Sequence, residues 1–155
     1  MNEFARIGAS APDLEAQTQD IMPHNIEAEQ QLLGALLTNN DVYDRVASIL
    51  QPSHFFDPVH GRIYETAEAR IRKNAIASPV TLKAFLEKDP GLAELGGPAY
   101  LVNLAGASIS AFAARDYAQL IYDLAIRREL IAIGRNIADK ASTVDVDSEP
   151  SEQIV

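Results

Sequence analysis

The sequence contains no cysteine. This absence excludes disulfide bonds and thiolate zinc sites, and it fits a reducing compartment. No run of about 18 apolar residues is present, so no membrane-spanning segment is predicted. The first 20 residues lack both the basic region and the apolar core of a signal peptide. We therefore expect a cytoplasmic protein.

Motifs of nucleotide and hydrolytic chemistry are also missing. The sequence has no G-x-x-x-x-G-K-[ST] loop, no G-x-S-x-G elbow and no H-E-x-x-H pair. The pair Gly96-Gly97 is accompanied by neither a lysine nor a preceding strand, so it does not predict a phosphate site. Alternating runs of β-branched residues are absent, which excludes a predicted sheet. The expected fold class is all-α, without a cofactor or metal bound to this chain.

The net charge of −9 is placed mainly at the two ends. Residues 1–24 have a net charge of −3 and residues 142–155 one of −4, which leaves −2 for residues 25–141. A nearly neutral body does not attract a phosphate backbone at long range. The chain by itself is therefore a poor candidate for tight nucleic-acid binding.

Apolar spacing and helix-capping residues predict a compact body of about five helices over residues 23–108. A disordered arm over residues 1–22 is expected to precede it. Leu82, Phe85 and Leu86 are expected to face inward in the fourth helix, which Asp89-Pro90-Gly91 is expected to close. The predicted N-caps of the helices, including a longer sixth one, are Asn25, Asn40 or Asp41, Asp57, Ser78, the Gly96-Gly97 turn and Ser110.

The sixth predicted helix is the first helix of a hairpin, over residues 109–141. About 30 residues span roughly 45 Å, more than the roughly 30 Å width of the body, so the helix should project. It has two apolar stripes, and a helix that is apolar on two sides needs two partners. We expect a returning helix on one side and a second chain on the other. The stripes are Tyr117, Ile121, Leu124 and Ile131, and Ile126, Leu130, Ile133 and Ile137.

The expected interface combines the first stripe with two arginines. Its residues are Tyr117, Ile121, Leu124, Arg127, Arg128 and Ile131. The arginines could lie along apolar surface with their charges in water, or they could form ion pairs across the interface. Residues 142–155 are expected to form a turn and the start of a truncated second hairpin helix. We therefore expect a piece of a longer protein that is a monomer or a weak dimer by itself.

The segment from His54 to His60 is the clearest candidate for chemistry, because two histidines flank Asp57. Zinc requires three or four ligands, and no further ligand is evident. Pro58 at the first helical position instead places Asp57 at the N-cap, where its carboxylate accepts a backbone N–H. His60 then lies in the first turn, where the helix dipole disfavours its charged form. We interpret Asp57, Pro58 and His60 as the structural start of a helix, with a metal site or a partner contact as alternatives.

Five segments in order resemble the N-terminal domain of the bacterial replicative DNA helicase, the DnaB family, over residues 23–141. They are NIEAEQQLLGALLTNNDVYDRV, LQPSHFFDPVHGRIYETA, SPVTLKAFLEK, LGGPAYLVNLA and ARDYAQLIYDLAIRRELI. The resemblance implies a helical body and a hairpin that pairs between subunits, giving a trimer of dimers on a hexameric ring. It also implies docking of the C-terminal domain of primase, with a helicase loader as a further candidate partner.

In that family ATP and magnesium bind a separate motor domain, through which the ring contacts DNA. The resemblance therefore implies that the parent protein is an ATP-dependent helicase and that this chain is not itself an enzyme. The alternatives from the residues alone are a free-standing helical adaptor for protein interactions and a small helical enzyme or DNA-binding module.

The cap interpretation predicts the effect of Asp57→Ala. Loss of the capping carboxylate is expected to lower the free energy of unfolding by about 0.5–2 kcal/mol. Urea unfolding measures this change, and metal analysis of both proteins should detect no zinc. Stoichiometric zinc in the unsubstituted protein, lost on substitution, would contradict the interpretation.

Overall fold

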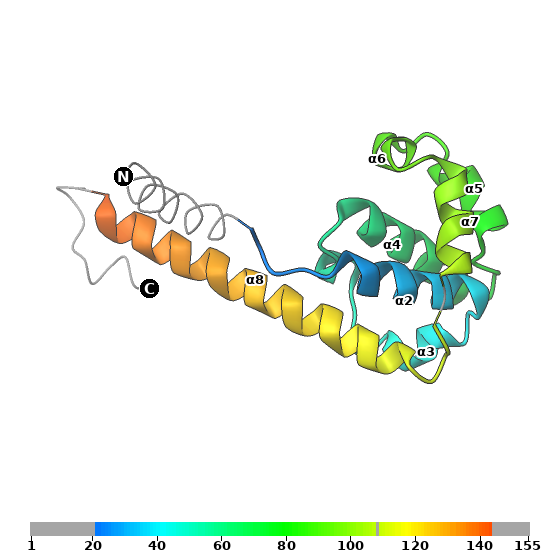
Figure 1. The fold of residues 1–155 in the computed structure, drawn as a ribbon, viewed down its shortest axis with the longest axis horizontal. Coiled ribbons are helices and arrows are strands. Elements are labelled where there is room, and N and C mark those ends of the chain that lie inside the picture. The colour runs from blue at the N-terminus through cyan, green and yellow to red at the C-terminus, as the bar shows by residue number, and fades with distance from the viewer. Residues whose placement is uncertain (1–20, 108, 144–155) are drawn as a thin grey trace, which may run out of the picture.

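The computed structural model describes residues 21–107 and 109–143, and within these ranges it contains helices and no strand (Figure 1). The predicted all-α class is confirmed. In chain order the elements are α2 (Ile26–Thr38), α3 (Val42–Val46), the 3₁₀ helix η1 (Pro52–His54), α4 (Pro58–Arg72), α5 (Pro79–Leu86), α6 (Pro90–Glu94), α7 (Pro98–Gly106) and α8 (Ala114–Ser142). None of the helices in the described part is long and apolar enough to cross a membrane.

Helix α2 lies at the centre of the body and packs against α4, α7 and α8. Its residues Leu32, Leu33 and Leu36 are fully buried, as are Ile63 of α4 and Leu101 of α7. Burial of each such side chain contributes about 1.5–3 kcal/mol relative to its exposed state. The core therefore assembles around α2, which contacts most of the other elements.

Side-chain caps start α2, α4 and α5 at the predicted residues. The Asn25 side chain accepts the N–H of Ala28 at 2.9 Å, and Asp57 accepts that of Val59 at 2.8 Å. Ser78 caps α5, and a proline occupies the first turn of α4, α5, α6 and α7. A proline there loses no helical hydrogen bond, since the first N–H groups have no helical partner. The predicted caps at Asn25, Asp57 and Ser78 are confirmed.

The segment at Asp89 begins a short helix, α6, although the sequence led us to expect only a terminator. The Asp89 carboxylate accepts the N–H of Leu92 at 3.1 Å and also binds the Arg62 guanidinium at 2.5 and 2.9 Å. The Arg62 hydrogen bonds, with help from backbone N–H groups, lower the pKa of Asp89 to about 2. This contact between α4 and α6 joins residues 27 positions apart, so local spacing could not predict it.

Two further predictions in the body differ from the structure. The spacing of Val42, Val46, Ile49 and Leu50 predicts a second helix that extends to Leu50, but α3 ends at Val46 and is followed by turns. Phe85 was expected inside, yet it is 61% exposed, whereas Leu82 and Leu86 of the same helix are buried. Both errors concern helices of eight residues or fewer, for which apolar periodicity gives little information.

Helix α8 is the longest helix, and it begins at Ala114 rather than near Ser110. Ser110 caps the turn that precedes it, accepting the N–H of Ala113 at 3.3 Å. The first part of α8 packs against α2, α3 and η1, and the rest projects from the body (Figure 1). The long projecting helix is thus confirmed. The predicted arm, apart from residues 21 and 22, and the predicted second hairpin helix lie outside the described residues.

Gly61 of α4 lies where η1 approaches most closely. A Cβ atom at this position would lie 2.7 Å from the carbonyl oxygen of Pro52, whereas one at Gly134 of α8 would meet nothing within 4 Å. Gly61 is therefore required for the packing of η1 on α4, and Gly134 is not required for packing against the described residues.

These two glycines give a matched prediction. Gly61→Ala should lower the free energy of unfolding by roughly 1–3 kcal/mol through overpacking. Gly134→Ala should raise it, by up to about 1 kcal/mol, through helix propensity. Urea unfolding of both variants measures the difference, and equal effects of the same sign would contradict this account of the close approach.

Candidate functional site

The side chains of His54, Asp57 and His60 do not converge on a common point. His54 Nδ1 accepts the N–H of Gln51 at 3.0 Å, while Asp57 caps α4. His60 is fully buried and bonds Glu29 instead. No group of three or more His, Cys, Asp or Glu side chains in residues 21–107 and 109–143 is arranged to hold a metal ion. Each of the three side chains is therefore engaged separately within the fold.

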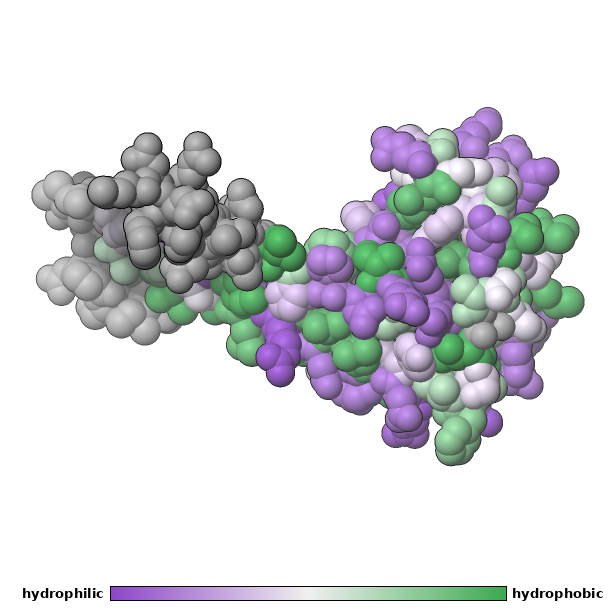
Figure 2. All heavy atoms as spheres, viewed as in Figure 1, coloured by the Kyte–Doolittle hydropathy of each residue, from purple (hydrophilic) through white to green (hydrophobic). Residues whose placement is uncertain are grey.

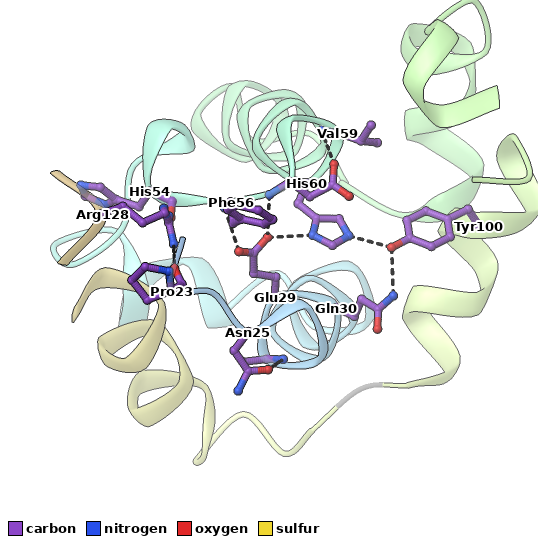
Figure 3. Close-up of polar contacts among 12 residues, drawn as sticks. Pro23, Asn25, Glu29, Gln30, His54, Phe56, Val59, His60, Tyr100 and Arg128 are labelled. Carbon is purple, nitrogen blue, oxygen red and sulfur yellow. Dashed lines mark hydrogen bonds and ion pairs between the residues drawn. The ribbon is translucent and has the colours of Figure 1, made fainter. Parts of the chain in front are cut away.

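The carboxylate of Glu29 is the centre of a buried polar network (Figure 3). This side chain of α2 is only 2% exposed. Its Oε2 accepts the N–H of Phe56 at 2.8 Å, and its Oε1 accepts the N–H of Asp57 at 3.3 Å and contacts His60 Nδ1 at 2.9 Å. A buried charge is tolerated only when hydrogen bonds compensate its lost hydration. Glu29 thus fixes the start of α4 against α2.

His60 extends this network to α7. Its Nε2 lies 2.6 Å from the hydroxyl of Tyr100, which also accepts a hydrogen bond from Gln30 Nε2 at 3.2 Å. One arrangement satisfies the hydrogen-bonding capacity of every member. In it a neutral imidazole donates a hydrogen bond from Nδ1 to Glu29, and Nε2 accepts a hydrogen bond from the Tyr100 hydroxyl. Burial raises the pKa of Tyr100, which keeps that proton in place. The network therefore connects α2, α4 and α7 without leaving a group free to act on a substrate.

Sequence patterns missed the centre of this network. The position of Glu29 after the predicted cap Asn25 predicts an acid in the first turn of a helix, where the dipole favours it. The structure shows that the same residue is buried and bonds residues 27 to 31 positions away. The one sequence signal for the burial of Glu29 was its place on the same helical face as Leu33 and Leu36, at spacings of four and seven residues.

Arg128 joins α8 to the loop that Glu29 holds. Its Nη1 donates to the carbonyl oxygen of Pro23 at 2.9 Å and its Nη2 to that of His54 at 2.7 Å (Figure 3). The guanidinium also lies over the ring of Phe56, 5.5 Å from its centroid. Arg128 was predicted at an interface with another subunit. Its guanidinium is engaged within its own chain, and its place at an interface stays a prediction.

The other predicted interface residues lie in different environments. Ile121 is 1% exposed and belongs to the core of the body, so its predicted place at an interface is corrected. Tyr117 is partly buried and packs against the same core. Leu124 and Ile131 are half-buried, and Arg127 is exposed. Two members of the first predicted stripe, Tyr117 and Ile121, therefore belong to the chain's own packing.

The second stripe is the one that the fold leaves uncovered. Leu130 is 62% exposed, Ile133 49% and Ile137 48%, all on the part of α8 beyond the body. A groove of about 510 Å³, lined by Tyr122, Asp123, Ile126, Arg127 and Leu130, lies at the start of this stripe. We call Leu130, Ile133 and Ile137 the α8 stripe. It is an apolar helix face without cover from the described residues.

The buried network predicts the effect of Tyr100→Phe. Loss of the hydroxyl leaves Nε2 of buried His60 without its partner, which should lower the free energy of unfolding by about 1–3 kcal/mol. Tyr117→Phe is the control, and it should change stability by less than about 0.5 kcal/mol. Thermal or urea unfolding of both variants gives the comparison, and a Tyr100→Phe protein as stable as the control would refute the role of this hydroxyl.

Comparison with known proteins gives consistent matches. The protein-family model for the DnaB-like helicase N-terminal domain matches residues 21–123 of this sequence. The replicative DNA helicase DnaB of Rickettsia felis is 41% identical over 134 residues, covering 86% of this chain and 27% of that protein. The DnaB of Haemophilus influenzae is 30% identical over 138 residues, covering 86% and 30%. The chain thus spans less than a third of the length of these relatives.

Solved structures show the same fold. The N-terminal domain of DnaB helicase from Mycobacterium tuberculosis superposes with a TM-score of 0.78 at 26% identity, covering 86% of this chain and 93% of that one. A DnaB-like replicative helicase, described with its interactions with primase, gives a TM-score of 0.65 at 26% identity, covering 84% and 31%. On these matches in sequence and structure, the chain belongs to the family of DnaB-like helicase N-terminal domains.

Proposed function

We propose that this chain is the assembly and primase-docking module of a hexameric replicative DNA helicase. In this proposal the body is a rigid platform, and α8 carries the contact between subunits. ATP and magnesium would bind a motor part of the parent protein, which would also contact DNA and perform the unwinding. The chain itself contributes association rather than catalysis.

The observation that carries this proposal is the exposure of the α8 stripe. Leu130, Ile133 and Ile137 are spaced by three and four residues, so they share one face of the helix. Apolar side chains gathered on one face of a projecting helix indicate a missing partner. A returning hairpin helix and a second subunit would together cover α8, as two helix layers cover each other in a bundle.

Primase docking is supported by a relative. A DnaB-like helicase of the same fold, 26% identical to this chain, is known with its interactions with primase. The contacts of Arg128 with the body support this role, because they hold α8 in a defined position relative to the body. We propose the C-terminal domain of primase as the docking partner.

Sedimentation tests the assembly role with a polypeptide that extends past Val155 through the returning helix. We expect a dimer at high micromolar concentration, because burial of three or more aliphatic side chains contributes several kcal/mol to association. The double variant Leu130→Ser/Ile137→Ser should be monomeric. Val102→Ser, which changes an exposed apolar residue of the body, should leave the dimer intact.

The unsubstituted protein, the double variant and the Val102→Ser control must show equal helix content by circular dichroism, so that a change in sedimentation reports association and not unfolding. A strictly monomeric unsubstituted protein would overturn the assembly role, and so would a double variant that dimerises like the control. Titration of the isolated primase C-terminal domain into the same proteins tests docking separately, and an absence of saturable binding would overturn that part.

A further inference from the structure

Residues 69–86 differ in charge from the rest of this acidic chain. They contain Arg70, Arg72, Lys73 and Lys83 and no acidic residue, in a protein whose net charge is −9. The segment comprises the end of α4, the connection that follows, and α5. Positive charge is thus concentrated at one place on the body.

The same segment exposes apolar side chains. Val80 is 82% exposed, Ile76 67% and Phe85 61%. Arg70 brings these groups together, because its Nε donates to the carbonyl oxygen of Ile76 at 2.6 Å and its guanidinium lies 5.4 Å from the centroid of the Phe85 ring. In Figure 2 hydrophobic and hydrophilic side chains lie next to each other at the end of the body where Figure 1 draws α5. Basic and apolar groups therefore share one surface.

Most of the positive charge of this surface is not neutralised within the chain. Arg72 is an exception, since it lies 3.6 Å from Glu68 and donates to the Tyr43 hydroxyl at 2.9 Å. Arg70, Lys73 and Lys83 form no ion pair with any carboxylate of the described residues. These three cations remain available to an acidic ligand.

We propose that this surface binds an acidic segment of a partner protein in which apolar side chains alternate with carboxylates. We define it as the α4–α5 surface: Arg70, Lys73, Ile76, Val80, Lys83 and Phe85. Carboxylates would meet the three cations, and aliphatic side chains would cover Ile76 and Val80. Charge complementarity would set both the association rate and the choice of partner.

Two other occupants fit this surface less well. Single-stranded nucleic acid binds through aromatic platforms on which the bases stack. Two of the three apolar residues here are aliphatic, and Arg70 already lies over the ring of Phe85. A second copy of the same surface would place cations against cations in a symmetric contact. The α4–α5 surface also lies at the opposite end of the body from the projecting part of α8 (Figure 1), so the inference does not depend on the proposed assembly role.

Fluorescence anisotropy tests the proposal with the full chain and a labelled probe. The probe is a 20-residue peptide in which glutamates flank leucines at helical spacing. We expect saturable binding that weakens about tenfold when sodium chloride is raised from 50 to 300 mM, through screening. Lys73→Glu/Lys83→Glu should weaken binding by at least about tenfold, and Val80→Ser/Phe85→Ser by at least about fivefold.

Matched variants and ligands make the test specific. Arg127→Glu/Leu130→Ser on α8 should keep the affinity of the unsubstituted protein, and all variants should unfold at similar temperatures because the substituted residues are exposed. A polyglutamate peptide of the same length should bind more weakly than the probe. Absence of saturable binding of the peptide probe would overturn the proposal. An equal loss of affinity for the probe in the α8 variant, or tighter binding of a 20-nucleotide oligothymidine than of the probe, would also overturn it.

Discussion

The arrangement of the body depends on the hydrogen bonds of the Glu29 carboxylate. A charge buried to this extent would be strongly destabilising by itself, and removal of one partner from a buried charged pair costs on the order of 3–5 kcal/mol. Glu29 is tolerated because two backbone N–H groups and the His60 imidazole bind it. Those donors come from a loop and from α4, so the charge is stabilised only when α2, the loop and α4 are in place together. The cost of burying the charge thus favours one relative arrangement of these elements.

This constraint extends from the core to the projecting helix. Phe56 is one of the two residues whose backbone N–H binds Glu29, and its ring lies beneath the guanidinium of Arg128. Arg128 also binds two carbonyl oxygens outside α8, one of them from His54 in η1. Helix α8 therefore leaves the body in a direction set by the same loop that Glu29 positions. A rigid exit presents the α8 stripe at a defined place, which suits a helix that pairs with other chains.

Local signals made the helix starts predictable from the sequence. Asn25, Asp57 and Ser78 combine a capping side chain with the apolar pattern that follows, and a proline strengthens the last two, so a few neighbouring residues hold the information. The Glu29 network could not be predicted in this way, because its members are up to 71 positions apart in the chain. Helix α6 was missed although its local signal is present, since Asp89 caps Leu92 and Pro90 lies in the first turn. The segment Asp89-Pro90-Gly91 was interpreted as the end of the preceding helix.

The two stripes of α8 show a different limit of sequence analysis. Residue spacing identified both stripes and the need for two partners. The two stripes are similarly apolar in the sequence, so spacing could not show which partner covers which stripe. The assignment of Ile121 to an interface failed because the body itself is one of the partners, and it covers that position. The exposed Leu130, Ile133 and Ile137 belong to the other stripe. The two stripes differ in whether the body covers them, because the body contacts only the first part of α8. The extent of that contact depends on the packing of α2, α3 and η1 against α8.

Native-state hydrogen exchange of the Phe56 and Asp57 amides tests the central role of Glu29 most directly. Neither N–H has a backbone acceptor in the structure, so their protection must come from the Glu29 carboxylate. The account predicts that both amides exchange nearly as slowly as those of Leu33 and Leu36 in the buried centre of α2, through global unfolding. Exchange of the two amides at the rate of an exposed loop, in a protein whose α2 amides remain protected, would contradict it.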